Sequence, residues 1–420
     1  MHDLKTIRHN FDTVYAGVQK RGKGDFGLLR VQELEVKRRE ILLELEAKKN
    51  QSNVKSRQVP QLKKAGEDAT ELLAELKELS GEINQLEVEI KAVEDEVTEL
   101  LFMVPNVPHD DIPIGQGEED NVELRRWGEP RKFDFEPKPH WDIGTERDWL
   151  DFDRGAKVVG SRFTFVKKEA AKLERALMNY YLDFHDGIYT EINAPAVANR
   201  AAMTGTGQLP KFEDDMYHMA EDDLFLIPTA EVTLTNLYRE EILSHEDLPI
   251  YLTGYTPCFR REAGSAGRDT RGIIRQHQFG KVEMVKFSTP ETSVAEHDDM
   301  VAHAEKLIQS LEIPYRVIEL CSADLGFSAA KTIDIELWFP SAETYREISS
   351  LSNFTDFQAR RANIRYRNAE GKVGYVHTLN GSGLPTGRML AAILENNQTE
   401  DGKVIVPKVL RPYMGGKDEI

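Results

Sequence analysis

A heptad pattern over residues 66–101 constrains the fold of this chain more than any other feature of its sequence. Nine aliphatic residues follow one another at spacings of four and three, the pattern that places one apolar stripe along a coiled-coil helix. They are Leu72, Leu76, Leu79, Ile83, Leu86, Ile90, Val93, Val97 and Leu100. The preceding segment also favours a helix, with a weaker apolar seam and an expected break or kink at Pro60. The sequence therefore predicts two long helices in succession, at about 27–64 and 68–101.

Charge separates these two helices. Residues 1–65 carry 15 Lys and Arg against 8 Asp and Glu, whereas residues 66–101 carry 2 against 12. This asymmetry, with a turn at 64–68, predicts an antiparallel hairpin whose charges complement each other. Taken alone, such an arm is more typical of a dimerisation segment than of a ligand-binding one, because heptads specify packing. The cations towards its tip favour phosphate contacts instead: Lys48, Lys49, Lys55, Arg57, Lys63 and Lys64.

Composition bounds the class of protein. The only two cysteines, Cys258 and Cys321, are far apart, which excludes a disulfide framework and a cysteine-rich zinc site. No run of about 18 apolar residues occurs, so we expect a cytoplasmic protein with no membrane partner. The histidines are scattered, so we expect no zinc. The net charge of -18 argues against general nucleic-acid binding, and it confines any such contact to basic segments. The phosphate-loop and dinucleotide-binding signatures are absent.

The rest of the chain indicates a second domain. A proline-rich, acidic run over 104–128 is typical of a linker, between an N-terminal domain at 1–103 and a larger domain at 129–420. Helices and strands then alternate irregularly, which predicts an α+β fold with helices flanking a mostly antiparallel sheet. Helices are expected near 167–185, 230–242, 289–311, 356–361 and 388–398. Strands are expected near 189–194, 224–227, 258–261, 279–287, 315–320, 333–339 and 345–348.

The segment from Pro257 to Phe279 holds the clearest chemistry. It is interpreted as a strand, a long loop rich in Gly and Arg, and a return strand. Arg260 on the first strand can direct a planar pair of donors at a phosphate, and Glu262 shares its face of the sheet. Surface charges on an ordinary hairpin would explain any one of these residues. Five arginines and a glutamate in one hairpin favour a phosphate site.

At this point the sequence resembles a known family. FRREAG, GRDTRG and RQHQFGKVEM resemble motif 2 of the class II aminoacyl-tRNA synthetases, in the form found in bacterial-type seryl-tRNA synthetases. YTEINAP resembles motif 1, which implies a homodimer, and GSGLPTGR with the following helix resembles motif 3. TAE, GTGQLPKF, EISSLSNFTDFQARR and VLRPYMGG also match, as does the arm. The resemblance covers nearly the whole chain and implies a class II catalytic domain that joins serine to tRNA.

The resemblance implies an ATP site in which Arg260 and Arg388 are catalytic. Arg260 would hold the α-phosphate, and Arg388 with Arg275 the outer phosphates. Glu262 would bind the adenine amino group, and Phe279 would stack on the base opposite Arg388. Glu347 and Ser350 would hold Mg²⁺ with the nucleotide. The full implied ATP-binding set is Arg260, Arg261, Glu262, Arg275, Gln276, Phe279, Glu347, Ile348, Ser349, Ser350 and Arg388.

The resemblance also implies the sites of the other substrates. The serine pocket would contain Thr229, Ala230, Glu231, Arg260, Glu283, Asn380 and Ser382. Arg268 and Arg271 would join the arm cations in binding serine tRNA, with selenocysteine tRNA as a second candidate. A relative that loads a carrier protein would be expected to lack the arm. A non-catalytic descendant would be expected to have lost residues such as Arg260 and Glu283, and both are present.

Overall fold

The computed structural model describes residues 1–22, 24–263 and 271–420. They form two compact units, and each is described by itself. One contains 2–19 and the described part of 23–105, and the other contains Met1, 20–22 and the described part of 106–420. We call them the arm unit and the core unit.

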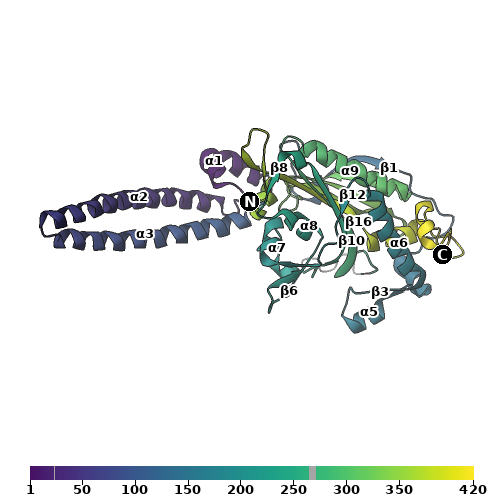
Figure 1. Ribbon diagram of the computed structural model, residues 1–420. Coiled ribbons are helices and arrows are strands. Elements are labelled where there is room, and N and C mark those ends of the chain that lie inside the picture. Colours follow the sequence, from purple (N-terminus) through teal and green to yellow (C-terminus); the bar gives the residue numbers. More distant parts are fainter. Residues whose placement is uncertain (23, 264–270) are drawn as a thin grey trace. The chain divides into compact units, whose positions relative to one another are not determined.

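The arm unit confirms the predicted coiled-coil hairpin. Helix α1 spans Leu4–Gln19, α2 spans Leu28–Ala65 and α3 spans Thr70–Met103, and Figure 1 shows α2 and α3 side by side. All nine heptad residues of α3 are buried or half-buried. Gly66 ends α2 in the left-handed conformation, with φ of 75°, which suits glycine. The chain then turns back into α3.

The break expected at Pro60 does not form, because α2 continues through this residue to Ala65. A proline inside a helix removes one backbone hydrogen bond and costs about 3 kcal/mol. Packing against α3 and ion pairs across the hairpin, such as Lys48 with Glu82 at 2.9 Å, oppose that cost. The long helix is thus held by its partner helix as well as by its own propensity.

The core unit is built on an eight-stranded sheet in the order β1-β11-β12-β13-β16-β10-β9-β4. Every neighbouring pair is antiparallel except β4 and β9, which confirms the predicted mostly antiparallel sheet. The strands are β1 Val122–Trp127, β4 Thr190–Glu191, β9 Ile250–Phe259, β10 Gln278–Ser288, β11 Tyr315–Glu319, β12 Lys331–Phe339, β13 Thr344–Asn353 and β16 His377–Pro385.

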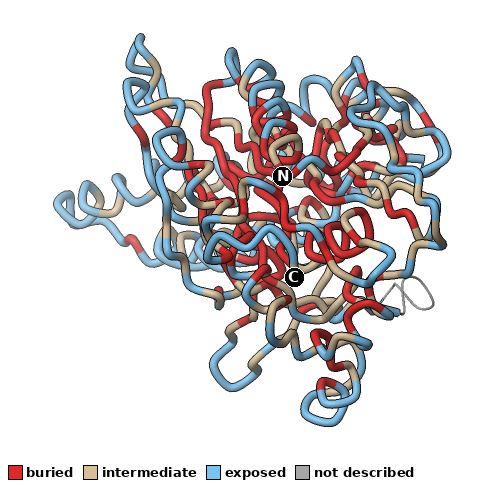
Figure 2. The backbone as a smooth tube through the Cα atoms, turned by 90° about the vertical axis from the view of Figure 1, so that its right-hand side faces the viewer, coloured by how far each residue is buried: buried red, intermediate tan, exposed pale blue. Residues whose placement is uncertain are grey.

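One face of this sheet is covered by three helices, which leaves the other face for chemistry. Helices α6 (Lys168–His185), α9 (Ser293–Ser310) and α11 (Thr386–Asn396) pack on the sheet in Figure 1. Strand β10 shows the division, because Val282 and Met284 belong to the core beneath these helices. Side chains alternate along a strand, so Lys281 and Glu283 face the opposite side. Figure 2 shows the buried residues concentrated inside this unit.

Shorter elements complete the core unit. The helices are α4 His140–Glu146, α5 Phe152–Val158, α7 Arg200–Thr206, α8 Glu231–Thr235 and α10 Phe357–Ala362. Small sheets are formed by β2 Leu150–Asp151 with β3 Phe165–Val166, by β5 Val197–Asn199, β7 Leu224–Leu226 and β6 Tyr217–Met219, and by β15 Val373–Tyr375, β14 Arg365–Arg367 and β8 Ile242–Ser244.

Two local predictions differ from the structure. The range predicted as a linker, 104–128, contains β1, which pairs with β11 at the sheet edge. The helix predicted over 230–242 ends at Thr235, is followed by a short 3-10 turn, and gives way to β8. Pairing of β8 with β14 fixes Ile242, the last residue of the predicted range, in a strand, so tertiary contacts override helix propensity there.

Candidate active site

Arg260 directly follows β9 and lies in the walls of two cavities, and also of a third that shares residues with each of them. Its Nε donates to the carbonyl of Pro228 at 3.2 Å, and its guanidinium lies 5.2 Å from the centre of the Phe279 ring. Its backbone N–H donates to the His277 carbonyl, which continues the pairing of β9 with the return strand. Because both cavities include Arg260 in their walls, one side chain can contact two bound molecules at once.

The larger cavity has a volume of about 340 Å³. Nine residues of the ATP-binding set from sequence line it: Arg260, Glu262, Arg275, Gln276, Phe279, Glu347, Ile348, Ser350 and Arg388. The other two do not. Arg261 is exposed, with its guanidinium 5.9 Å from the Tyr217 ring, and Ser349 is buried and donates to the Ser382 carbonyl. Ser349 points away from the cavity because side chains alternate along a strand, and its neighbours Ile348 and Ser350 line the cavity.

Charged side chains in this cavity are held by defined partners. Arg275 Nη1 donates to Glu262 Oε2 at 2.5 Å. Arg388, at the start of α11, donates from Nε and Nη2 to the Ile274 carbonyl, each at 3.3 Å, and from Nη1 to the Glu347 carbonyl. The cavity therefore presents three guanidinium groups whose positions are fixed, as binding of a polyanion requires.

The residues predicted to hold Mg²⁺ lie on β13, opposite acidic residues of β12. Ser350 pairs with Asp334 across β12 and β13, and Glu347 pairs with Glu336. Burial and the nearby Glu347 raise the pKa of Asp334 well above its usual value. In the described parts of the chain, no three acidic, histidine or cysteine side chains are grouped to hold a metal alone. Mg²⁺ is commonly bound by one or two carboxylates plus substrate phosphates, so these oxygen donors fit it.

The smaller cavity, about 250 Å³, contains two carboxylates that lie close to each other. Glu231 Oε1 accepts a hydrogen bond from Gln358 Nε2 at 2.6 Å, and Glu283 Oε2 lies 2.5 Å from Lys281 Nζ. Burial and the charge of Glu283 raise the pKa of Glu231 to about 7. Thr229 and Asn380 also line this cavity. Such a pocket can accept an ammonium group and a small polar side chain.

Not every residue predicted for the serine pocket lies there. Ala230 is fully buried in a hydrophobic cluster, and Ser382 lines the larger cavity. The side chain of buried Asn380 lies close enough to Glu231 to lower the pKa of that carboxyl group, so its amide borders the two carboxylates of this cavity. Sequence reasoning missed Lys281 and Gln358. Their signal was weak, because each resembles an ordinary polar residue within an amphipathic element.

Sequence reasoning also missed the support behind one wall of this cavity. The wall is the segment 325–329, and all five of its backbone carbonyls are hydrogen-bonded to Arg21 or Asn106. Arg21, only 4% exposed, donates to the carbonyls of 325, 326 and 329, and Asn106 donates to those of 327 and 328. Arg21 is part of the core unit, as are Lys20 and Gly22, although the segment before Lys20 belongs to the arm unit.

The predicted tRNA-binding cations fall into two groups. Lys48, Lys49 and Lys55 form ion pairs across the hairpin, with Glu82 at 2.9 Å, Glu87 at 2.6 Å and Glu75 at 2.6 Å. Arg57, Lys63 and Lys64 are exposed and form no ion pair with any described residue. Arg271 is exposed in the core unit, and Arg268 lies outside the described residues.

Comparisons with known proteins agree with this geometry. Residues 1–108 match the family model of the seryl-tRNA synthetase N-terminal domain, and residues 211–397 match that of the tRNA synthetase class II core domain (G, H, P, S and T). The chain is 56% identical over 419 residues to the serine–tRNA ligase of Alkaliphilus oremlandii, covering 99% of each chain. It is 57% identical over 418 residues to that of Thermoanaerobacter pseudethanolicus, covering 99% of this chain and 98% of the relative.

A solved structure is also similar over the whole length. Seryl-tRNA synthetase from Pyrococcus horikoshii complexed with ATP has a TM-score of 0.95 and 39% identity, covering 100% of this chain and 99% of that one. Among the residues described here, no helix has the length and apolar character needed to cross a membrane.

Proposed function

This chain belongs to the seryl-tRNA synthetases, a family of class II aminoacyl-tRNA synthetases, and from that premise we infer its reaction. It is a serine–tRNA ligase that activates L-serine with ATP, forming seryl-adenylate and pyrophosphate. It then transfers serine to the 3′-terminal adenosine of serine tRNA. The observation that supports this reaction best is the place of Arg260 in the walls of both cavities, where it can contact the two reacting molecules.

Activation requires two anions to approach each other. The carboxylate of serine attacks the α-phosphate in line, and pyrophosphate leaves. A solved relative is complexed with ATP, and we assign ATP to the larger cavity of this chain and serine to the smaller one. Arg260 and Arg388 would then neutralise the charge that builds up between the reactants. Positioning and charge neutralisation provide the catalysis, and no protein nucleophile is needed.

Within the larger cavity we propose the following contacts. Phe279 stacks on the adenine, Glu262 accepts from its amino group, and Arg275 binds the outer phosphates. Arg275 and Glu262 form an ion pair in this structure, so contacts to phosphate and base would have to replace it. Mg²⁺, held with the phosphates by Glu347 and Ser350, would supply further charge neutralisation when bound.

In the smaller cavity we propose that Glu283 and Glu231 receive the serine ammonium group and that Arg260 receives its carboxylate. Asn380 and Thr229 are the candidates for contact with the serine hydroxyl. An alanine complex would leave these buried polar groups without partners, which is the strongest means a pocket has of rejecting a substrate that lacks a hydroxyl.

We further propose that the arm binds serine tRNA, with selenocysteine tRNA as a second candidate. Arg271, in the core unit, would contact the incoming tRNA end. Motif 1, which includes β4 at the edge of the large sheet, is proposed to form a homodimer. Ile188 beside this edge is 52% exposed, which favours a contact there. A cytoplasmic location remains a prediction from the composition.

The test is ATP–pyrophosphate exchange with serine, alanine, glycine and threonine in turn. We expect exchange with serine, and exchange with alanine or glycine alone would contradict the assignment. Arg260→Ala should lower exchange by about 10²- to 10³-fold, the usual effect of losing a preorganised partner of transition-state charge. Arg261→Ala is the matched control, because Arg261 lines neither cavity, and exchange by this variant should stay near the wild-type rate.

A further inference from the structure

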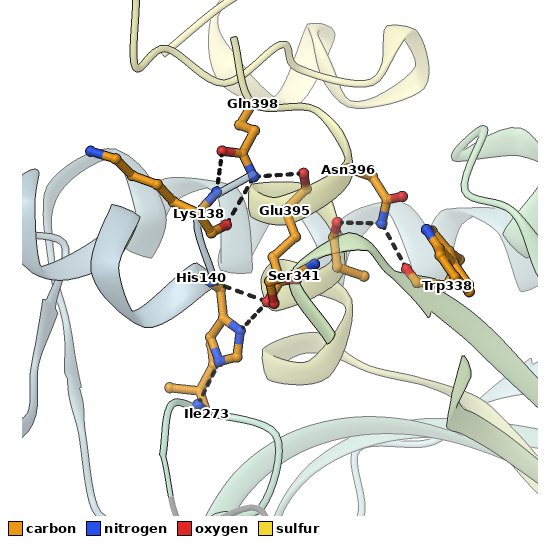
Figure 3. Close-up of polar contacts among 9 residues, drawn as sticks. Lys138, His140, Ile273, Trp338, Ser341, Glu395, Asn396 and Gln398 are labelled. Atoms are coloured by element: carbon orange, nitrogen blue, oxygen red, sulfur yellow. Dashed lines mark hydrogen bonds and ion pairs between the residues drawn. The ribbon is translucent and has the colours of Figure 1, made fainter. Parts of the chain in front are cut away.

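A buried histidine and glutamate lie just behind the larger cavity. His140 begins α4 and Glu395 lies near the end of α11, and each side chain is 1% exposed. Figure 3 shows Glu395 facing His140. Gln398 forms two hydrogen bonds with the backbone of Lys138 and donates a third to the backbone carbonyl of Glu395. None of these residues lines either cavity.

Three N–H groups converge on the Glu395 carboxylate. Oε1 accepts from the His140 backbone at 3.1 Å and from His140 Nδ1 at 2.7 Å, and Oε2 accepts from the Ser341 backbone at 3.2 Å. Although burial raises the pKa of Glu395, the hydrogen bonds from His140 and Ser341 outweigh burial, so the pKa lies below its usual value. Three donors to one carboxyl group favour its ionised form, which accepts on both oxygens.

The same hydrogen bonds assign the tautomer of His140. Its Nε2 accepts from the backbone N–H of Ile273 at 3.0 Å, so this nitrogen carries a lone pair. The ring proton is therefore on Nδ1, where it is donated to Glu395. Glu395 thus orients the His140 ring, and the ring accepts a hydrogen bond from the backbone N–H of Ile273.

That backbone N–H belongs to the return segment, residues 272–275, which leads from motif 2 loop to β10. Gly272 has φ of 76°, and a Cβ there would come within 2.0 Å of His140 Nε2, so only glycine allows this close approach. The next carbonyl, of Ile274, accepts from Arg388. The return segment is therefore attached to α11 twice, directly at Arg388 and through His140 at Glu395.

Helix α11 thereby sets the distance between two arginines of the larger cavity. Arg388 and Glu395 are seven residues apart on α11, about two turns, so they lie on the same side of one rigid element. Arg275 follows Ile274 immediately and faces the same cavity as Arg388. Movement of the return segment would change the position of Arg275 relative to Arg388.

We propose that His140 and Glu395 are positioning residues for ATP, acting through the backbone of the return segment on Arg275. This rests on the proposed function, in which Arg275 and Arg388 bind the outer phosphates. The pair contacts no substrate, and the serine cavity does not include the return segment. Loss of the His140–Glu395 pair should therefore weaken binding of ATP and pyrophosphate far more than binding of serine.

The experiment measures serine-dependent exchange at varied ATP and varied serine, with the thermal midpoint of each variant. His140→Ala should raise KM for ATP about tenfold or more, because misplacement of a binding group by about 1 Å is costly. KM for serine should change less than twofold. His140→Gln should recover much of the loss, since its Oε1 can accept the Ile273 N–H.

The control is His297→Ala. His297 is also 1% exposed, but its Nε2 bonds to the Leu351 carbonyl on β13, away from the return segment. It should lower the thermal midpoint without a selective rise in KM for ATP. An equal rise of both KM values in His140→Ala, or no recovery in His140→Gln, would overturn the proposal.

Misfolding of a variant and failure of the proposed function can each be told apart from failure of this proposal. If His140→Ala does not fold, Glu395→Gln replaces it, and an unchanged KM for ATP in that variant overturns the proposal. Absence of serine-dependent exchange in the wild-type protein would instead refute the proposed function itself.

Discussion

Lys281 Nζ lies 2.5 Å from Glu283 Oε2, although the two side chains are only 10% and 3% exposed. The residues are two positions apart on β10 and share the face that borders the smaller cavity. Glu231 is close enough for Glu283 to raise its pKa. Two carboxylates thus face one lysine in this cavity, which leaves a place for a second cation such as the ammonium group of serine.

Loss of Lys281 alone should destabilise the protein. Lys281→Met would leave Glu283 buried without its cation, and breaking a buried pair this way typically costs about 3–5 kcal/mol. Combining it with Glu283→Gln removes the stranded charge, so the double variant should be more stable than Lys281→Met. Urea unfolding of the three variants checks this. Strictly additive losses would show that the two side chains are not coupled.

Binding of serine should strengthen as pH rises through about 7. Glu231, with its pKa raised to about 7, is mostly protonated below that pH, and the serine ammonium group favours its ionised form. Serine binding must then release a proton below pH 7, so KM for serine should fall by up to about tenfold per pH unit there and level off above. Exchange measured from pH 5.5 to 8.5 checks this.

Glu231→Gln provides the control for that profile. A glutamine cannot titrate, so the dependence of KM for serine on pH around 7 should disappear even if binding is weaker throughout. A profile unchanged by the substitution would assign the titration to another group.

The sequence predicted the parts of the fold that depend on periodicity. The nine-residue heptad seam and the change of charge between 1–65 and 66–101 specify a hairpin, since each reflects contacts between two adjacent helices. Arg260 could also be found, because an arginine at a strand end beside a Gly-rich loop is readily connected with phosphate. Its place in the walls of two cavities could not, since the smaller cavity is formed by segments distant in sequence.

Residues that act through the tertiary structure escaped prediction. Lys281 follows the alternation of β10 like any strand residue, and its importance depends on Glu231, fifty residues away. Arg21 resembles one more cation of a basic N-terminal segment, yet it is buried among backbone carbonyls. Such residues have no local signal, because their partners are brought near only by folding.

A substitution at Arg21 should raise KM for serine more than KM for ATP. Arg21→Lys keeps the charge but provides three donors in place of five, so carbonyls in the wall 325–329 lose their partners. We expect a loss of about 1–3 kcal/mol in the free energy of unfolding and a several-fold rise in KM for serine. Unfolding in urea and exchange at varied serine and ATP measure both.

The adjacent Lys20 is a suitable control for Arg21. It forms an ion pair with Asp110 at 3.0 Å, and Asp110 is fully exposed, so Lys20→Met should leave the free energy of unfolding and both KM values nearly unchanged. A rise in KM for ATP equal to that for serine in Arg21→Lys would contradict a role confined to the wall.

The two groups of arm cations allow a comparison at equal charge. Arg57, Lys63 and Lys64 are exposed and unpaired among the described residues, whereas Lys48, Lys49 and Lys55 are paired with glutamates of α3. Paired lysines must give up a partner before they bind a phosphate, so replacing the first group with alanine should weaken tRNA binding more. We expect aminoacylation kcat/KM for tRNA to fall about 10- to 100-fold and the slope of log affinity against log salt to decrease by about 2. Exchange without tRNA should not change in either triple variant. An equal loss of aminoacylation in both triple variants would mean that the total positive charge of the arm attracts tRNA. A loss of exchange would show that these residues do more than bind tRNA.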